Sequence, residues 1–330
     1  MVQKSIGELI SELSLANMRI FYLTNKVKKN EYTSRDVRKL KILKRFRPEL
    51  VKAINESFEE RRNTEKKMIS IFWPPKHRYY LSTKIRGYQI GHFLGAKLNP
   101  KKKSKNDVNI YLKPGNLDNI DDGDWVDVLD GGKFIKKLKK RPGINLIAAS
   151  KTSYDWLKKY LTNEVVLIPH QHLNWERQRR ERKKVDTCGY TGGASPIARE
   201  MYGRIEKTVR KIGFNFVTCF EKFGKREDAA NFYKNIDILV IGAWELGDPN
   251  IHKTPTKVIN AASFGVPSVA YPLRGYKEIE GYYLRTNNME ELLAGVKKLK
   301  AEYDQWPEKL IRMAEPYHIE NIVKLYRKLT

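Results

Sequence analysis

The chain has 330 residues, 41% of them hydrophobic, and a formal net charge of +26. This length predicts about two domains with an appendage, and the apolar content excludes a chain that is disordered throughout. No run of about 18 apolar residues exists, which excludes a membrane-spanning helix by sequence. The first residues lack the apolar block of a secretory signal, and Cys188 and Cys219 lack metal-ligand spacing. We therefore expect a cytoplasmic protein, with peripheral membrane contact as one option, and a charge that favours anionic partners.

Residues 1–66 predict a helical hairpin without strands, because apolar residues recur at three- and four-residue steps in two stretches. Pro48 should kink or restart the second helix. That helix carries a basic outer face formed by Arg38, Lys39, Lys41, Lys44, Arg45 and Arg47. Two roles stay open for the hairpin. In the first, its basic residues recruit an anionic acceptor or carrier. In the second, its apolar stripe pairs with another copy to give a homo-oligomer.

Short apolar runs alternate with helical stretches over residues 67–173 and again over residues 185–314. In the first part the runs are 68–73, 108–112, 125–130, 144–150 and 165–170; in the second they are 186–192, 214–220, 236–243, 267–272 and 281–285. This alternation predicts an α/β protein with two doubly wound, Rossmann-like domains. Residues 174–184 are strongly charged and predict an exposed linker or surface helix, and residues 315–330 predict a terminal helix. Two such domains place ligands at the carboxyl ends of both sheets.

The stretch KTPTKVINAASFGVPSVAYP (253–272) resembles the donor-site segment of GT-B glycosyltransferases of the retaining, family 4-like class. In that class a Glu-x7-Glu pair is followed by a helix of small residues and a Gly-x-Pro turn. Here Asn260 stands where the second glutamate falls, and His252 stands where the first falls. VVLIPHQHLNWE (165–176) resembles the interdomain hinge of the class, and the helix after Pro316 resembles the one that crosses back onto the first domain.

The resemblance covers residues 68–330 and implies a GT-B glycosyltransferase that moves a sugar from a nucleoside diphosphate donor, such as a UDP-sugar, to an acceptor. Residues 185–314 would bind the donor, and residues 67–173 would bind the acceptor, a surface glycan or a lipid-linked precursor. No cofactor or metal is expected, since protein cations neutralise the diphosphate in this class. Two alternatives stay open. One is a DNA-modifying glycosyltransferase acting on a hydroxylated base, and the other is a non-catalytic nucleic-acid-binding protein on a degenerate scaffold. The second alternative is motivated by the altered motif and by basic runs at 101–105, 133–141 and 177–184.

On the donor side, Lys253, Thr254, Thr256 and Lys257 lie before and within the first turn of the predicted 256–264 helix. Cations and hydroxyls beside a helix N-terminus suit a diphosphate. The alternative is a solvated basic turn in which one threonine caps the helix. Asn260 lies on the same helix face as Lys257 and could bond ribose hydroxyls or satisfy a buried backbone group.

A glycine-rich turn follows the first strand of the second domain. Its predicted donor-binding residues are Gly189, Thr191, Gly192 and Gly193. Glycines let a backbone approach a phosphate or sugar closely, although any tight strand–helix turn also favours them.

In the first domain, Arg86 lies in the connection after the first strand, where the resembling class approaches the donor phosphates. Asp127 and Asp130 end the strand over 125–130, and carboxylates at that end face the cleft, where one could serve as a general base. Asp130 could instead cap the next helix. These three residues are the predicted catalytic groups.

His170 and His172 would share a face if they lay along a strand, but two histidines make an incomplete metal site. A position in the hinge beside the cleft is favoured for both residues.

Overall fold

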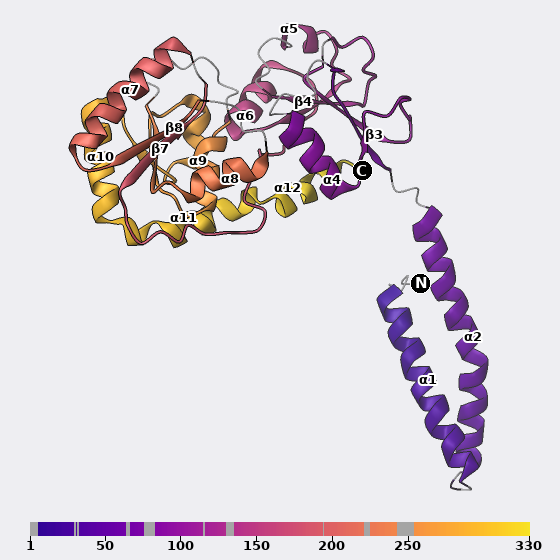
Figure 1. Cartoon of the computed structure of the whole chain (residues 1–330). Helices are drawn as coiled ribbons and strands as arrows, with labels where there is room; N and C mark the ends of the chain where they lie inside the picture. Colours follow the sequence, from indigo (N-terminus) through magenta and orange to yellow (C-terminus); the bar gives the residue numbers. More distant parts are fainter. Residues whose placement is uncertain are drawn as a thin grey trace. The chain divides into compact units, whose positions relative to one another are not determined.

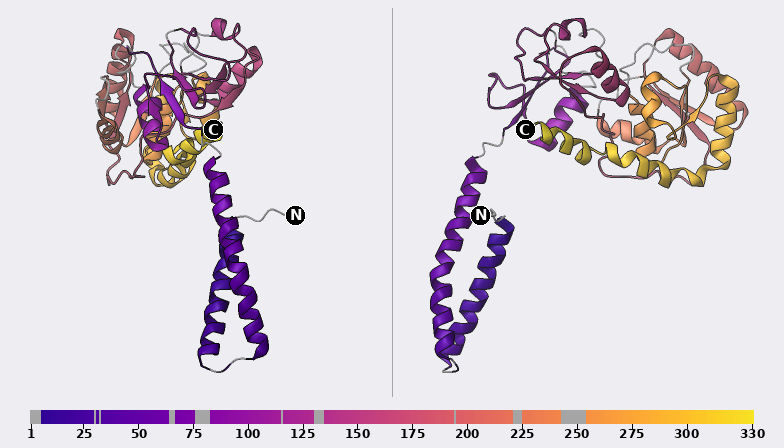
Figure 2. Two further views of the ribbon diagram at one scale, coloured as in Figure 1. Left: turned by 90° about the vertical axis from the view of Figure 1, so that its right-hand side faces the viewer. Right: turned by 180° about the vertical axis from the view of Figure 1, so that it is seen from behind.

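The computed structural model describes residues 6–29, 31, 33–63, 67–75, 83–114, 116–129, 135–193, 195–220, 225–242 and 254–330. The chain divides into two compact units, Met1–Lys66 and Lys67–Thr330 (Figures 1 and 2). No helix within the described residues is long and apolar enough to cross a membrane.

The first unit is a hairpin of two antiparallel helices, α1 (Ile6–Lys28) and α2 (Ser34–Asn63). Its small core contains Leu9, Ala16, Leu50 and Ile54. Thr33 starts α2 by accepting a hydrogen bond from the Asp36 N–H (3.2 Å) and donating its own N–H to the Asp36 carboxylate (3.0 Å). The helix continues through Pro48, so the predicted restart there is wrong. Because Pro48 is exposed, the carbonyl that it leaves without an amide partner lies on the solvent side.

The second unit begins with a six-stranded parallel sheet in the order β2-β1-β3-β4-β5-β6. Its strands are β1 (Ile69–Phe72), β2 (Lys97–Leu98), β3 (Val108–Leu112), β4 (Trp125–Val128), β5 (Asn145–Ala148) and β6 (Val165–Leu167). Around it run the π-helical segment η2 (Lys84–Gln89), α4 (Ile90–Leu94), α5 (Ile135–Leu138) and α6 (Lys151–Tyr160). The strands are near-continuous apolar runs because helices cover a parallel sheet on both faces.

A five-stranded parallel sheet follows, in the order β11-β10-β9-β7-β8. Its strands are β7 (Thr187–Thr191), β8 (Asn215–Cys219), β9 (Ile238–Ile241), β10 (Ser268–Ala270) and β11 (Leu284–Arg285). Its helices are α7 (Pro196–Lys211), α8 (Arg226–Lys234), α9 (Thr256–Ser263), η3 (Arg274–Ile279), α10 (Met289–Ala301) and α11 (Pro307–Ala314). Ser195 caps α7 by accepting the Ala198 N–H, and Pro196 occupies its first turn, where its missing N–H costs nothing.

The last helix, α12 (Ile319–Tyr326), packs on the first sheet. Its buried residues Ile322 and Tyr326 share one hydrophobic core with Ile71 and Ile110 of β1 and β3. The predicted fold class is thus confirmed. It consists of two Rossmann-like sheets in the GT-B arrangement, preceded by a helical hairpin.

The charged segment 174–184 is not helical, and ion pairs attach it to the second sheet's domain. The Arg180 side chain is only 6% exposed, and its Nε donates to the Asp237 carboxylate (2.7 Å), which is completely buried. The other Asp237 oxygen accepts the backbone N–H groups of Asp186 and Thr187, both at 2.8 Å. Arg177 pairs with Glu315 in the segment leading into α12 (2.8 Å). The segment is therefore an ion-paired strap and not a loose linker.

Replacing Asp237 with alanine should destabilise the protein by about 3–5 kcal/mol, because it leaves the buried Arg180 guanidinium and two backbone N–H groups without their acceptor. Urea unfolding measures the change. The matched control is Glu308→Ala, which removes the exposed partner of Arg179 and should change stability little. Equal losses of stability in the two variants would contradict the role of Asp237 as the buried acceptor for Arg180 and the two backbone N–H groups.

Candidate functional site

The predicted donor-binding residues of two separate stretches lie together at the carboxyl end of the second sheet. Lys257, in the first turn of α9, places Nζ 3.4 Å from the Tyr190 hydroxyl of β7 and 4.6 Å from the centre of its ring. The turn after β7 lies against the same two groups, since a Cβ atom at Gly192 would collide with both Lys257 Nζ and the Tyr190 hydroxyl. Glycine at this position thus lets the turn and the lysine tip come close together, and a larger residue would displace Lys257 Nζ.

The start of α9 has no side-chain cap. Its cap residue is Pro255, and among the described residues no side chain caps the helix by accepting a hydrogen bond from its first amides. Thr254 and Thr256 instead bond each other, with their hydroxyl oxygens 2.8 Å apart. The expectation that a threonine caps this helix is thus wrong, because the hydroxyls bond each other and not the backbone. An uncapped helix start next to a lysine and a glycine turn is suited to an anionic group. Lys253 and His252 lie outside the described residues.

An aromatic stack supports this lysine. Tyr190 stacks on Tyr202 with ring centres 3.5 Å apart, and Phe220 packs on both rings. Burial raises the pKa of Tyr190, so its hydroxyl stays neutral and accepts the hydrogen bond from Lys257. The remaining turn residues Gly189 and Thr191 are buried in β7, whereas Gly193 has open space around it.

Asn260 connects α9 to the hinge. Its side chain is buried, and Oδ1 accepts the backbone N–H of Leu173 (3.0 Å). Asn174 adds a second link by donating Nδ2 to the Ser263 carbonyl (2.7 Å). Of the two roles expected for Asn260, the structure contains the bond to a buried backbone group; contact with ribose stays a prediction.

Arg86 and Asp127 form an ion pair that is fully buried on both sides. Arg86 Nη2 and Nε lie 2.7 and 2.8 Å from Asp127 Oδ2, and Nη1 donates to the carbonyls of Ile168 (3.0 Å) and Pro169 (2.9 Å). The Tyr326 hydroxyl reaches the same carboxylate at 3.3 Å. Burial by itself would lower the pKa of Arg86, but Asp127 more than offsets this and holds it above its usual value.

Neither side chain reaches solvent, so in this structure Arg86 and Asp127 contact each other and not the surface of the cleft. A catalytic role for either residue stays a prediction. The pair instead joins η2, β4, the hinge and α12. Asp130, the other predicted catalytic carboxylate, lies outside the described residues.

His170 and His172 lie in the hinge, because β6 ends at Leu167 and does not extend to them. Both are buried, and each has an Nδ1 atom without a hydrogen-bond partner among the described residues. Burial lowers the pKa of each to about 3. His172 packs against His318, with ring centres 5.3 Å apart. Within the described ranges, no group of three or more histidine, cysteine or acidic residues could hold a metal ion.

Glu278 is a cleft residue that the sequence patterns do not predict. It lies in η3, after β10, and accepts the backbone N–H of Lys151 at the start of α6 in the other domain. Beside it, the Thr152 hydroxyl donates to the Arg274 carbonyl (3.2 Å). Burial raises the pKa of Glu278. Glu278 belongs to the connection after β10, and its partner at the start of α6 follows only from the tertiary structure.

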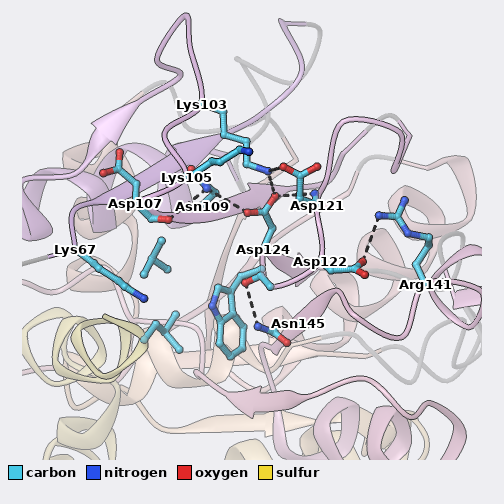
Figure 3. Close-up of a pocket in the computed structure, with 14 residues that line it drawn as sticks. Lys67, Lys103, Lys105, Asp107, Asn109, Asp121, Asp122, Asp124, Arg141 and Asn145 are labelled. Atoms are coloured by element: carbon cyan, nitrogen blue, oxygen red, sulfur yellow. Dashed lines mark hydrogen bonds and ion pairs between the residues drawn. The ribbon is translucent and has the colours of Figure 1, made fainter.

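A cavity of about 920 Å³ lies at the opposite edge of the first sheet (Figure 3). Asn109, Asp124 and Asn145 mark the amino ends of β3, β4 and β5 along its wall. Lys103 bridges Asp121 and Asp124 across it, at 2.5 Å from each carboxylate. Its mixed charge and its distance from the carboxyl ends separate it from the Lys257 site.

No protein-family model and no curated protein matches the sequence. Among solved structures, TarM matches with a TM-score of 0.51 and 13% identity over 69% of this chain and 55% of TarM. The GtfA/B complex matches with a TM-score of 0.48 and 10% identity, over 67% of this chain and 56% of that chain. UDP-GlcNAc 2-epimerase from Neisseria meningitidis, bound to UDP-GlcNAc, matches with a TM-score of 0.38 and 10% identity, over 80% of this chain and 99% of that chain. Neither of the last two is close enough to support an argument. The chain thus has the fold of GT-B glycosyltransferases and spans about half the length of TarM.

Acid should destabilise the protein through His170 and His172. Because both are held neutral while folded, with pKa values of about 3, the unfolded chain binds protons that the folded chain does not once the pH falls below about 6.5. Each histidine then costs up to about 1.4 kcal/mol per pH unit until the pH reaches the folded pKa.

Urea unfolding at pH 7 and pH 5 measures this loss. The His170→Gln, His172→Gln double variant should lose less stability between the two pH values than the wild type. The matched control is His92→Gln, at an exposed position of α4. An undiminished loss in the double variant would show that these histidines are not the acid-sensitive groups.

Proposed function

We propose that this protein is a glycosyltransferase that moves a sugar from a nucleoside diphosphate-sugar, such as a UDP-sugar, to an acceptor. The observation that supports this best is the meeting of Lys257, the uncapped start of α9 and the Gly192 turn at the carboxyl end of the second sheet. Those are the groups that a diphosphate requires: backbone amides, a point charge and room for close approach. The GT-B fold supplies the context but not the activity.

In the proposed reaction the second domain binds the donor and the first presents the acceptor. As the bond between the sugar and the diphosphate breaks, negative charge develops on the leaving phosphate. The Lys257 ammonium and the first amides of α9 would stabilise that charge, and preorganised electrostatic stabilisation of this kind commonly contributes more to catalysis than any other effect. The Tyr190–Tyr202 stack holds Lys257 in place beforehand, so no reorganisation is required during the reaction.

The proposed acceptor is a surface glycan or a lipid-linked precursor, reached from the cytoplasm at an anionic membrane surface. The basic residues of α2, among them Arg38, Lys41 and Arg45, are exposed and would recruit such an acceptor or its carrier. Hydroxylated DNA bases are the alternative acceptor for the same chemistry.

The strap argues against a purely nucleic-acid-binding role. Arg177, Arg180 and Arg182 belong to one of the three basic runs, and each of them pairs with a carboxylate of the chain. In a second run, Lys103 is held by two aspartates. Pairing within the fold reduces the positive charge that these runs offer to the phosphates of DNA, which favours the transferase.

Replacing Lys257 with alanine should weaken the binding of a nucleoside diphosphate roughly 10- to 100-fold, the size expected for one charge-assisted hydrogen bond. Isothermal titration calorimetry with UDP and other nucleoside diphosphates measures the effect. The matched control is Lys300→Ala, because Lys300 also lies over an aromatic ring, that of Phe214, in the same domain. Wild-type affinity in Lys257→Ala would remove this site from the proposal.

Transfer should proceed without added divalent metal, because protein cations are proposed to neutralise the leaving diphosphate. Donor turnover measured in EDTA should equal that measured in buffer alone. Abolition by EDTA and recovery with magnesium or manganese would replace the metal-free mechanism by a metal-assisted one.

A further inference from the structure

The hairpin exposes a second apolar face that its own core does not use. On α1, Leu9, Ala16 and Leu23 repeat every seven residues and are buried against α2. Opposite them, large apolar side chains at three- and four-residue steps face solvent, with Phe21 70% exposed and Met18 and Tyr22 60% exposed. Eight of the fourteen exposed large hydrophobic residues in the described part of the chain belong to this hairpin. A contiguous apolar face of this kind marks an interaction surface.

From Ser11 to Asn25 this outer face carries no charge, and the exposed residues Lys28 and Lys29 follow it at the end of the helix. Leu15, Met18, Phe21 and Tyr22 share it with Ser11, Ser14 and Asn25, as the helical repeat places them. The charged residues Glu8, Glu12, Arg19 and Lys26 follow one flank of the face at steps of four, seven and seven residues. The flank is acidic in the first half of α1 and basic in the second.

We propose that this α1 face binds the same face of α1 in a second copy of the chain, with the two helices antiparallel. In an antiparallel helix pair related by a two-fold axis, equivalent flanks face each other. Glu8 and Glu12 of one copy then lie opposite Lys26 and Arg19 of the other, so the flank is complementary to itself. Lys26 Nζ also lies 3.8 Å from the Asp36 carboxylate within the hairpin. An ion pair at that distance on the surface is weak, so Lys26 can interact with a glutamate of the second copy as well.

The charge pattern disfavours an anionic lipid surface and a nucleic acid as partners of this α1 face. An anionic lipid surface or a nucleic acid would require cations along both sides of the apolar face. Half of one flank is acidic, and on the opposite edge α1 has a cation only in its last turn, Lys28. The basic side chains of α2, including Lys41 and Arg45, are exposed and lie opposite the residues Leu43 and Leu50 that pack on α1. Two copies joined through α1 therefore keep their basic faces apart.

Sedimentation velocity of the full chain tests the pairing. The wild type should sediment as a dimer at micromolar concentration. Met18→Lys with Phe21→Lys should weaken dimerisation roughly 100-fold or more by burying charge. Both positions are exposed, so circular dichroism should show unchanged helicity. The matched control is Ile42→Lys with Phe46→Lys, which adds the same charges at exposed apolar positions of α2 and should leave the dimer intact.

Charge reversal tests the antiparallel arrangement. Glu8→Lys with Glu12→Lys gives an all-basic flank, and Arg19→Glu with Lys26→Glu gives an all-acidic one. Each variant alone should dimerise more weakly than the wild type, and an equimolar mixture of the two should restore dimers.

Three outcomes would overturn the proposal. One is a monomeric wild type, and another is a mixture of the two charge-reversed variants that fails to associate. The third is binding of the wild type to phosphatidylglycerol vesicles or duplex DNA that Met18→Lys with Phe21→Lys abolishes while the sedimentation of the chain stays unchanged, which would assign the face to that partner.

Discussion

Arg86 and Asp127 are charged groups in the interior of the first domain, and four segments depend on their pairing. The guanidinium comes from η2, the carboxylate from β4, the two carbonyls from the hinge after β6, and the ring and hydroxyl of Tyr326 from α12. The further contacts satisfy Arg86 Nη1 and Asp127 Oδ2, whereas Asp127 Oδ1 has no hydrogen-bond partner among the described residues. Removing either charge would leave the other buried and uncompensated. The pair therefore fixes where the hinge leaves the first sheet and where α12 returns to it, and both set the position of the second domain.

The cleft is bounded by two further contacts that depend on this arrangement. On the hinge side, Asn260 of the donor helix accepts the Leu173 N–H. On the other side, Glu278 accepts the first N–H of α6. The asparagine explains a departure from the motif of the resembling class. An amide oxygen can accept a buried backbone N–H without the desolvation cost of a carboxylate, so a neutral residue suits a position that serves as a hinge contact.

Local patterns predicted most of the fold. β3 has the predicted bounds, because a buried apolar run is encoded in consecutive residues. The two-residue strand β2 was missed because it is exposed and lies within a stretch that has a helical pattern. Gly95, whose φ of 65° places it in the left-handed region, ends α4 just before it.

The site was predictable only in part, for the same reason. Lys257 and Gly192 were found because each belongs to a recognisable local stretch. The contacts that define the cleft join residues far apart in sequence. Arg86 and Asp127 are 41 residues apart, Arg180 and Asp237 are 57 apart, and Lys151 and Glu278 are 127 apart. Periodicity and spacing carry no information at those separations. A sequence pattern can thus mark a charged residue as a candidate for the cleft. It does not tell whether the side chain will face a ligand or, like Arg86, a buried partner.

If α1 mediates pairing as proposed, the distribution of the net charge of +26 would let the hairpin combine its two predicted roles. In the strap, arginines are neutralised by carboxylates of the fold, whereas the basic residues of α2 face solvent. If α1 pairs with α1 of a second copy, the resulting assembly presents two basic α2 faces instead of one. Two weak electrostatic contacts on a single anionic surface reinforce each other through effective concentration, even when neither alone is strong. Assembly through α1 would then increase recruitment through α2, so the apolar and the basic faces of the hairpin serve one purpose and need not be alternatives.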